Sequence, residues 1–155
     1  MSDTPASRLK ALGIELPKPA APLANYVPTV RSGDLLFVSG QLPLANGKIA
    51  FTGKVGAAIS AEEGKEAAKL CAINILAQAA AALDGDLSRI VRCVKLGGFV
   101  ASAPDFLQHP AVVNGASDFM VAVLGDAGRH SRFAVGAPAL PFDASVEVEA
   151  VFEVR

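Results

Sequence analysis

The last strand-like segment of the chain, residues 146–154, constrains the fold most strongly because apolar and polar residues alternate along it. Alternate side chains of a β-strand point to opposite faces, so one face of this segment is entirely apolar. That face carries Val146, Val148, Ala150, Phe152 and Val154, and the other carries Glu147, Glu149, Val151 and Glu153. An apolar face of this kind has to be covered, and helices packed on one side of a single sheet would cover it.

A helix that can provide this cover is predicted between Ser60 and about Leu83. Ser60 and Glu63 form a capping box, in which each side chain bonds a backbone N–H that the helix leaves free. The second half of the helix is apolar nearly all round except at Asn74 and Gln78. These two residues are four positions apart and share a stripe, which we expect to meet solvent.

A second helix is predicted over residues 105–124, ending at Gly125. Pro110 lacks a backbone N–H and is tolerated only in a first turn, so the regular part should begin at about Ala111. Asn114-Gly115 interrupts the apolar pattern, which is compatible either with a kink or with a functional asparagine.

The remaining regular segments are predicted to be strands. Turn signals at residues 32–34 and at Asn46-Gly47 separate some of them. Gly97-Gly98 indicates a bulge or a close approach of another backbone. The order β-β-(β)-α-β-α-β-β favours a single sheet with helices on one face. Besides residues 146–154, the predicted strands are residues 26–30, 35–38, 90–101 and 133–137.

The composition allows one domain with a real core. The chain has 155 residues, of which 52% are hydrophobic and 19% charged. Prolines in residues 1–24 block both helix and strand, apart from a short helical pattern at residues 7–12. We therefore divide the chain into an N-terminal arm, residues 1–24, and a domain, residues 25–155. Cys71 and Cys93 lie in apolar segments, where buried free thiols are favoured although a disulfide is possible.

Charge and segment lengths exclude several classes of protein. The formal net charge of -1 argues against a nucleic-acid partner. No run of about 20 apolar residues exists, so we expect no membrane partner. No apolar run follows Arg8 and Lys10, so we expect no signal peptide and a cytoplasmic location. His109 and His130 lack the spacing of metal ligands, so we expect no metal site.

Arg132 is the most informative charged residue, because it opens an apolar strand and should lie at the mouth of that strand. A guanidinium binds a carboxylate through two parallel hydrogen bonds, although the spacing alone favours a surface ion pair with Asp or Glu as the explanation of an arginine here. Glu147 shares its face with two other glutamates, which repel one another unless one has a partner. Arg132 is a candidate partner, because consecutive strands often pair.

Three other polar residues are candidates with plain structural alternatives. Ser39 follows a buried strand, where it is equally compatible with a simple strand-to-turn transition. Tyr26 is the only tyrosine, and packing with its hydroxyl at a rim would explain it. Asn114 is the asparagine of the interrupted helix pattern described above.

Several motifs, taken in order, resemble the RidA or YjgF-like family. Tyr26-Val27 precedes a hairpin that continues into the run from Phe37 to Pro43, and Val113-Asn114 lies in the second helix. Arg132, then Leu140-Pro141, then the run Val-Glu-Val-Glu-Ala beginning at Val146, follow at the family's spacing. The resemblance covers residues 25–155.

The resemblance implies an α+β fold like that of bacterial chorismate mutase, with a single mixed sheet backed by two helices. It also implies a homotrimer with clefts between subunits, and the hydrolysis of enamines and imines such as 2-aminoacrylate to 2-keto acids and ammonia, without a cofactor. Arg132 would bind the carboxylate of the small substrate and Glu147 would help to place the attacking water. Tyr26, Ser39, Asn114 and Ala134 would line the cleft.

Two departures from the family pattern keep other functions open. Ala134 stands where the family often has cysteine, which is tolerable if only the backbone contacts the substrate. Arg129 and His130 make the approach to Arg132 more polar. A non-catalytic module that senses a small carboxylate is therefore the main alternative. An endoribonuclease, a label that some family members bear, is disfavoured by the absence of a basic, aromatic-interleaved patch.

Overall fold

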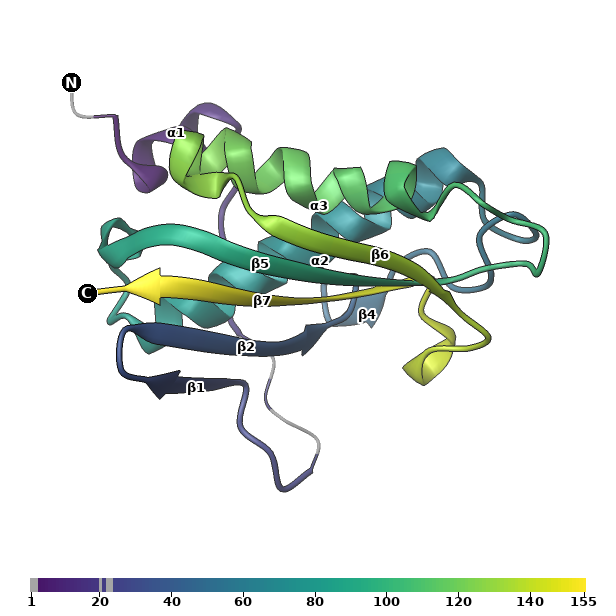
Figure 1. Cartoon of the computed structure of the whole chain (residues 1–155), viewed down its shortest axis with the longest axis horizontal. Coiled ribbons are helices and arrows are strands. Elements are labelled where there is room, and N and C mark those ends of the chain that lie inside the picture. Colours follow the sequence, from purple (N-terminus) through teal and green to yellow (C-terminus); the bar gives the residue numbers. More distant parts are fainter. Residues whose placement is uncertain (1–2, 20, 22–23) are drawn as a thin grey trace.

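Helices α2 and α3 lie side by side on one face of a five-stranded sheet (Figure 1). The computed structural model describes residues 3–19, 21 and 24–155. Three short 3₁₀ turns also occur, at Leu87–Arg89, Gly125–Gly128 and Pro141–Asp143. The helices and strands are, in chain order, α1 (Pro5–Ala11), β1 (Thr29–Ser32), β2 (Leu35–Gln41), β3 (Leu44–Ala45), β4 (Lys48–Ile49), α2 (Ala61–Ala82), β5 (Ile90–Ala101), α3 (His109–Leu124), β6 (Ser131–Ala137) and β7 (Val146–Val154).

The strand order of the main sheet is β1-β2-β7-β5-β6, and all neighbours are antiparallel except β5 and β6. This confirms the α+β class and the mixed sheet, but the described chain has three α-helices and a second, two-stranded sheet of β3 and β4. The tight turn expected at Asn46-Gly47 closes that small sheet, with φ of 52° and 75°. Turns with positive φ at both central residues match the twist of short hairpins.

The ends of several elements differ from the sequence prediction for simple steric reasons. β1 begins at Thr29 rather than at residue 26, because Pro28 has no N–H to donate to a strand ladder. α3 begins at His109 rather than at residue 105, because Pro110 is tolerated only in the first turn. The capping box of α2 is present as predicted, since Ser60 Oγ accepts from Glu63 N at 3.1 Å and Glu63 Oε1 accepts from Ser60 N at 3.1 Å.

The polar stripe of α2 is buried, which corrects the expectation that it meets solvent. Asn74 Nδ2 donates to the carbonyl oxygens of Leu42 and Leu44, at 3.0 and 3.1 Å. Gln78 Nε2 lies 3.5 Å from Gln41 Oε1. The connection from β2 to β3 crosses this stripe, and its backbone carbonyls need donors once they leave water. Asn74 is therefore polar because it binds backbone, and Gln78 because it meets the buried side chain of Gln41.

Glycines on β5 and α3 allow α3 to pack closely against the sheet and against α2. A Cβ on Gly98 would lie 2.6 Å from Val113 Cγ2, so Gly98 marks a close approach, whereas the irregularities of β5 lie earlier, between residues 90 and 95. A Cβ on Gly115 would collide with the Lys65 carbonyl of α2. α3 is continuous through Asn114-Gly115, so this pair marks the crossing of two helices and not a kink.

Both cysteines are buried free thiols, as predicted. Burial raises the pKa of the Cys93 thiol to about 12 and the pKa of the Cys71 thiol well above its ordinary value. A thiol that stays protonated is a poor nucleophile, so both behave as small apolar residues of the core.

Candidate functional site

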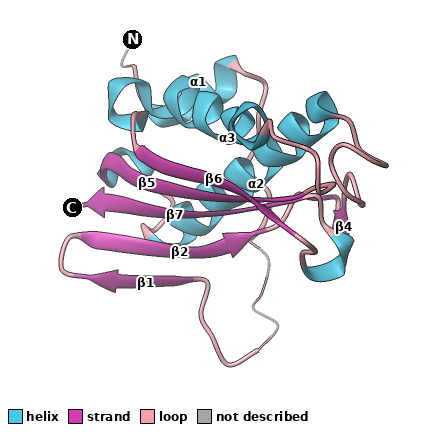
Figure 2. Cartoon of the chain, turned by 45° about the vertical axis from the view of Figure 1, so that its right-hand side comes forward, coloured by secondary structure: helices cyan, strands magenta, loops and turns pink. Residues whose placement is uncertain are grey.

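Arg132 lies on β6, the edge strand of the main sheet, beside α3 (Figure 2). Its side chain points to the face that the helices cover, because all its hydrogen-bond partners belong to α3. Ala134 and Gly136 follow at intervals of two on the same strand and therefore share this face. An edge strand has no further strand beyond it, so the guanidinium sits at the rim of the sheet.

α3 holds the guanidinium through residues spaced along one stripe of the helix. Arg132 Nη1 donates to Asn114 Oδ1 at 2.8 Å and to Ser117 Oγ at 3.1 Å. Arg132 Nη2 donates to the Pro110 carbonyl at 3.5 Å, a long contact. Two predicted site residues, Arg132 and Asn114, are thus in direct contact. We call Arg132, Asn114, Ser117 and Ala134 the arginine group.

One edge of the guanidinium remains available. An arginine has five N–H donors, of which two belong to Nη1, two to Nη2 and one to Nε. Both Nη1 donors and one Nη2 donor are used, whereas Nε–H and the second Nη2–H have no acceptor among the described residues. No ion pair joins Arg132 to a carboxylate in this part of the chain, so the simple surface pair does not explain it. The Nε–Nη2 edge has the geometry that captures a carboxylate through two parallel bonds.

The other predicted site residues gather near the end of β2 and the start of β7. Ser39 Oγ donates to the Val27 carbonyl at 3.0 Å, which ties Ser39 to the segment that carries Tyr26. Glu147 lies beside Gly40, where a Cβ would be only 2.8 Å from Glu147 Oε1. Gly40 is therefore needed to leave space for the carboxylate. We call Tyr26, Ser39 and Glu147 the glutamate group.

The expected pairing of Arg132 with Glu147 is wrong. β5 lies between β6 and β7, so the two strands are about 10 Å apart at ordinary strand spacing. The register places Glu147 opposite Phe99, on the face of the sheet away from α3. The two strands are consecutive in sequence, but β6 joins β5 in parallel while β7 enters between β5 and β2. One chain thus carries the predicted site as two separate groups on opposite faces.

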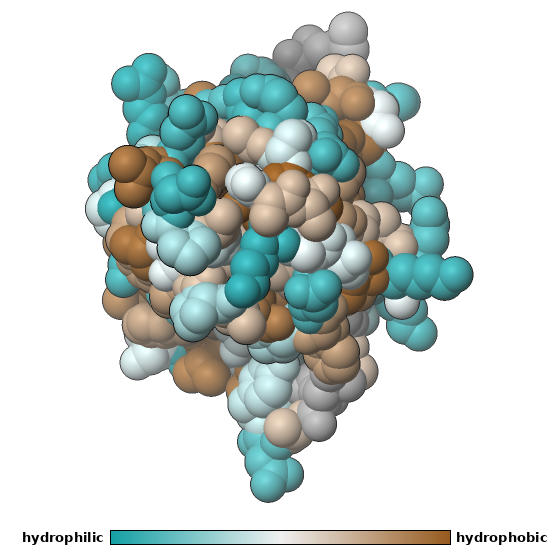
Figure 3. Space-filling view, turned by 90° about the vertical axis from the view of Figure 1, so that its right-hand side faces the viewer, coloured by the Kyte–Doolittle hydropathy of each residue, from teal (hydrophilic) through white to brown (hydrophobic). Residues whose placement is uncertain are grey.

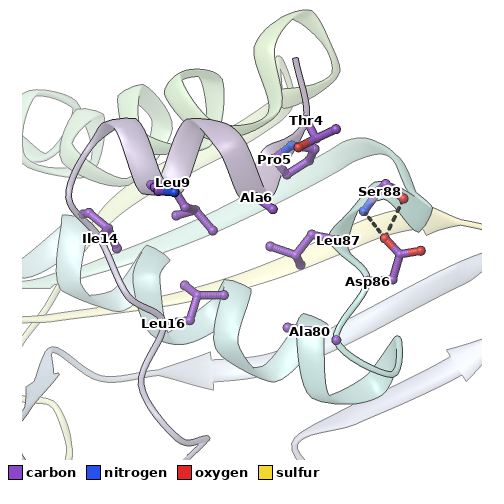
Figure 4. A pocket seen from close by; sticks show the side chains of 12 residues that line it. Thr4, Pro5, Ala6, Leu9, Ile14, Leu16, Ala80, Asp86, Leu87 and Ser88 are labelled. Carbon is purple, nitrogen blue, oxygen red and sulfur yellow. Dashed lines mark hydrogen bonds between the residues drawn. The ribbon is translucent and has the colours of Figure 1, made fainter. Parts of the chain in front are cut away.

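Of the cavities that lie outside both groups, two are lined in part by the N-terminal helix α1 or by His109. The first, about 480 Å³, lies between α1 and the end of α2 and is lined mainly by apolar residues such as Leu9, Leu16 and Leu87 (Figure 4). The second, about 410 Å³, lies at the end of the molecule shown in Figure 3, where polar and apolar residues are mixed. There His109 Nε2 lies 3.0 Å from Ser102 Oγ and Phe106 packs edge-on against the ring, so His109 is a structural residue of the first turn of α3.

The described residues contain no cluster of His, Cys, Asp or Glu that could hold a metal ion. None of the described helices has the length and apolar character required to cross a membrane.

Comparison with known proteins decides the family. A family model described as "YjgF/chorismate mutase-like, putative endoribonuclease" matches residues 6–154. This chain belongs to the YjgF/chorismate mutase-like family. Protein TCP17 of Trypanosoma cruzi is 49% identical over 151 residues, which are 97% of this chain and 94% of that protein.

Solved structures of YjgF-like proteins agree with this assignment. The structure of Atu1372 from Agrobacterium tumefaciens, a protein of unknown function, is 54% identical and has a TM-score of 0.92, covering 97% of this chain and 92% of that chain. RidA from the Antarctic bacterium Psychrobacter sp. PAMC 21119 is 26% identical with a TM-score of 0.61, covering 88% of this chain and 94% of that chain. The resemblance to the RidA family that the motifs indicate is therefore confirmed.

Ser117 is the residue of this YjgF-like site that the motifs do not identify. It bonds Arg132 directly, but it stands outside every run that resembles the family. The available signal is its spacing, because Ser117 follows Asn114 by three residues and so lies on the same stripe of a helix.

The environment of Glu147 leads to a prediction about pH. Partial burial, and secondarily the nearby charge of Glu149, raise the pKa of Glu147 above its ordinary value of 4.5. The folded chain then holds this proton more tightly than the unfolded chain. The stability that results is fully present below the ordinary pKa and is lost as pH rises through the raised value.

Glu147→Gln should therefore raise the melting temperature relative to wild type at about pH 8 and leave it unchanged at about pH 3.5, because glutamine carries no charge to desolvate. Thermal unfolding of both proteins across this range measures the difference. Glu153→Gln, on the same face of β7, is the matched control. An equal effect of Glu147→Gln at both pH values would show that its cause is not ionisation.

Proposed function

We propose that this protein hydrolyses small enamines and imines derived from 2-amino acids, such as 2-aminoacrylate, to 2-keto acids and ammonia. The observation that carries the proposal is the free Nε–Nη2 edge of Arg132, held by Asn114 and Ser117 at an open strand edge. Such an edge fits the carboxylate that these intermediates retain from their parent amino acids. The reaction uses no cofactor, because the imine carbon is already electrophilic.

The chemistry needs a fixed substrate and a placed water molecule. An enamine such as 2-aminoacrylate first loses a proton from nitrogen and gains one at its terminal carbon, which gives the imine. With its carboxylate on Arg132, the imine presents its C=N carbon to water, whose oxygen forms the new C–O bond while the nitrogen gains a proton. In the resulting carbinolamine the hydroxyl loses a proton and the nitrogen gains one, so the C–N bond breaks and leaves ammonia and the keto acid. Glu147 can accept a proton from the water and return one to the nitrogen, and burial raises its pKa above the ordinary value, which favours holding that proton. Orientation by the protein supplies much of the rate gain.

The site requires a second copy of the chain, because one chain keeps the two groups on opposite faces. The face of the sheet away from the helices offers a contact surface, since it exposes large apolar side chains. These are Leu35, Phe37, Phe99 and Val135. We propose a homotrimer in which the arginine group of one subunit meets the glutamate group of its neighbour, forming three clefts. The partners are then the small carboxylate and two further copies of the same chain.

The deaminase is preferred to an endoribonuclease on physical grounds. RNA binding depends on neutralising phosphates with a basic surface. The formal net charge of this chain is -1, and the arginine edge described above accommodates a single carboxylate. A carboxylate sensor with the same cleft remains the second candidate, favoured by the tight fixation of Arg132 through Asn114 and Ser117, neither of which is an acid or a base.

A mixing experiment tests the reaction and the shared site together. Arg132→Ala and Glu147→Gln should each abolish ammonia release from 2-aminoacrylate generated in situ. Co-expression of the two variants should restore about a quarter of the wild-type rate, because half of the arginine groups and half of the glutamate groups are intact in random trimers. A coupled assay of ammonia measures the rate.

Each failure has a distinct meaning. Wild-type protein that releases no ammonia above the buffer rate would disprove the deaminase, and stabilisation by pyruvate without turnover would then support the sensor. Mixed variants that stay inactive would show that the two groups do not meet across subunits. Protein that sediments as a single chain would contradict the trimer.

A further inference from the structure

His130 and Ser117 form a chain of hydrogen bonds that ends on Arg132. His130 Nδ1 lies 2.6 Å from the carbonyl oxygen of Gly128, and His130 Nε2 lies 2.9 Å from Ser117 Oγ. Ser117 Oγ in turn lies 3.1 Å from Arg132 Nη1. The chain therefore links the turn before β6, the middle of α3 and the guanidinium.

For a neutral imidazole ring, the chemistry of these atoms sets the direction of each bond. A carbonyl oxygen only accepts, so His130 Nδ1 carries a hydrogen. In a neutral imidazole the other nitrogen then has a lone pair, so Nε2 accepts the hydroxyl hydrogen of Ser117. The lone pairs of Ser117 Oγ are left to accept from Arg132 Nη1, which they do. His130 thus prevents the serine hydroxyl from turning its hydrogen toward the arginine.

The far end of the chain is anchored on backbone. Gly128 is buried against α3, where a Cβ would collide with the Met120 carbonyl and lie 2.8 Å from Val121 Cα. The Gly128 carbonyl is therefore held in place by the helix that also carries Ser117. Because α3 carries Ser117 and also holds Gly128, the hydrogen-bond chain is fixed at both ends and leaves the guanidinium of Arg132 little freedom to rotate.

We propose that Ser117 and His130 are positioning residues, which turn the Nε–Nη2 edge of Arg132 outward for a carboxylate. With both Nη1 donors taken by Asn114 and Ser117, the guanidinium plane is fixed and its open edge needs no reorganisation when a ligand binds. The inference rests on the proposed function only in taking Arg132 as the carboxylate anchor, and it holds for a catalyst and for a sensor alike.

The test uses the full-length protein, with pyruvate as the probe and three variants. Ser117→Ala and His130→Leu should raise the Kd for pyruvate and the KM for 2-aminoacrylate about 5- to 30-fold, less than the loss of a charged hydrogen bond to the ligand itself, because the anchor is loosened and not removed. kcat should change less than about threefold, because ground state and transition state lose the same anchor. His130→Gln should stay within about threefold of wild type, since its Oε1 can accept from Ser117.

A second measurement separates positioning from general damage. Nitrogen-15 NMR of the arginine side chains should show slow rotation of the Arg132 Nη groups in wild type and His130→Gln, and faster rotation in Ser117→Ala and His130→Leu. Arg129→Gln, a change at the exposed neighbour of His130, is the control and should alter none of these values. Alanine is well tolerated inside a helix, so Ser117→Ala remains informative even if His130→Leu folds poorly.

The outcomes distinguish this inference from the proposed function. Wild type that binds pyruvate but releases no ammonia would reject the deaminase, while the effects of the variants on Kd would still support positioning. Unchanged Kd and NMR spectra in Ser117→Ala would overturn the positioning role, as would a His130→Gln protein no better than a folded His130→Leu protein. Absence of pyruvate binding in wild type would overturn the anchor and with it this inference.

Discussion

Arg132→Ala should eliminate measurable pyruvate binding and lower kcat/KM for ammonia release at least about 100-fold. The open edge of Arg132 can make two parallel charge-assisted hydrogen bonds, each contributing on the order of 1.5–3 kcal/mol. Losing both removes about 3–6 kcal/mol, and every 1.4 kcal/mol is about a factor of ten. Calorimetry with pyruvate and the ammonia assay measure the two losses independently.

Two further variants show whether geometry or charge matters at this position. Arg132→Lys keeps the positive charge but cannot hold Asn114 and Ser117 while presenting two parallel donors, so we expect it to recover less than about a tenth of the lost affinity. Arg129→Ala removes an exposed arginine three residues away and should leave binding unchanged. A lysine variant equal to wild type would show that a point charge is enough, and would contradict bidentate capture.

Local patterns predicted the parts of the fold that depend on neighbouring residues. The alternation at residues 146–154 gave the last strand with its correct bounds, and the capping box gave the start of α2. Both signals are short-range, since a strand face and a helix cap involve residues within a few positions of each other. The apolar run that follows Arg132 is also a short-range pattern, and it predicted that Arg132 lies at the opening of a strand.

Contacts between distant segments could not be predicted in this way. Nothing local specifies that β7 inserts between β5 and β2, so the pairing of Arg132 with Glu147 was a reasonable but wrong expectation. Asn74 and Gln78 look like residues of a solvated stripe, because their partners lie at least 30 positions earlier in the chain. Polar residues on an apolar helix are therefore ambiguous until the segment that crosses them is known.

In the candidate site too, some residues could be predicted from the sequence and others could not. Asn114 and Arg132 meet because α3 and β6 are adjacent, and the family resemblance had already selected both. Ser117 and His130 belong to no such motif, and only the folded geometry shows that they complete the hydrogen bonding of the arginine. Residues that contact a ligand are easier to recognise in a sequence than residues that orient them.

Gly115→Ala should lower the free energy of unfolding by about 2–3 kcal/mol, because overpacking a close helix crossing costs about that much. The added methyl would collide with the Lys65 carbonyl, which is backbone and cannot rotate away, so α2 and α3 would have to separate. For a chain of this size we expect the melting temperature to fall by about 5–10 °C. Thermal unfolding followed by circular dichroism measures this.

Gly64→Ala, on α2, is the matched control, since it makes the same chemical change in the facing helix. Its Cβ would meet only side-chain methyl groups of Val55 and Val112, at 3.1–3.4 Å, and these can shift by the few tenths of an ångström required. Alanine also gains about 1 kcal/mol of helix propensity over glycine, so this variant should be close to neutral. Equal falls in melting temperature for both variants would show that the helix crossing at Gly115 is no more tightly packed than the rest of the core. A large loss confined to Gly115→Ala, accompanied by weaker pyruvate binding, would mean that the same close crossing which stabilises the fold also holds Asn114 and Ser117 within reach of Arg132.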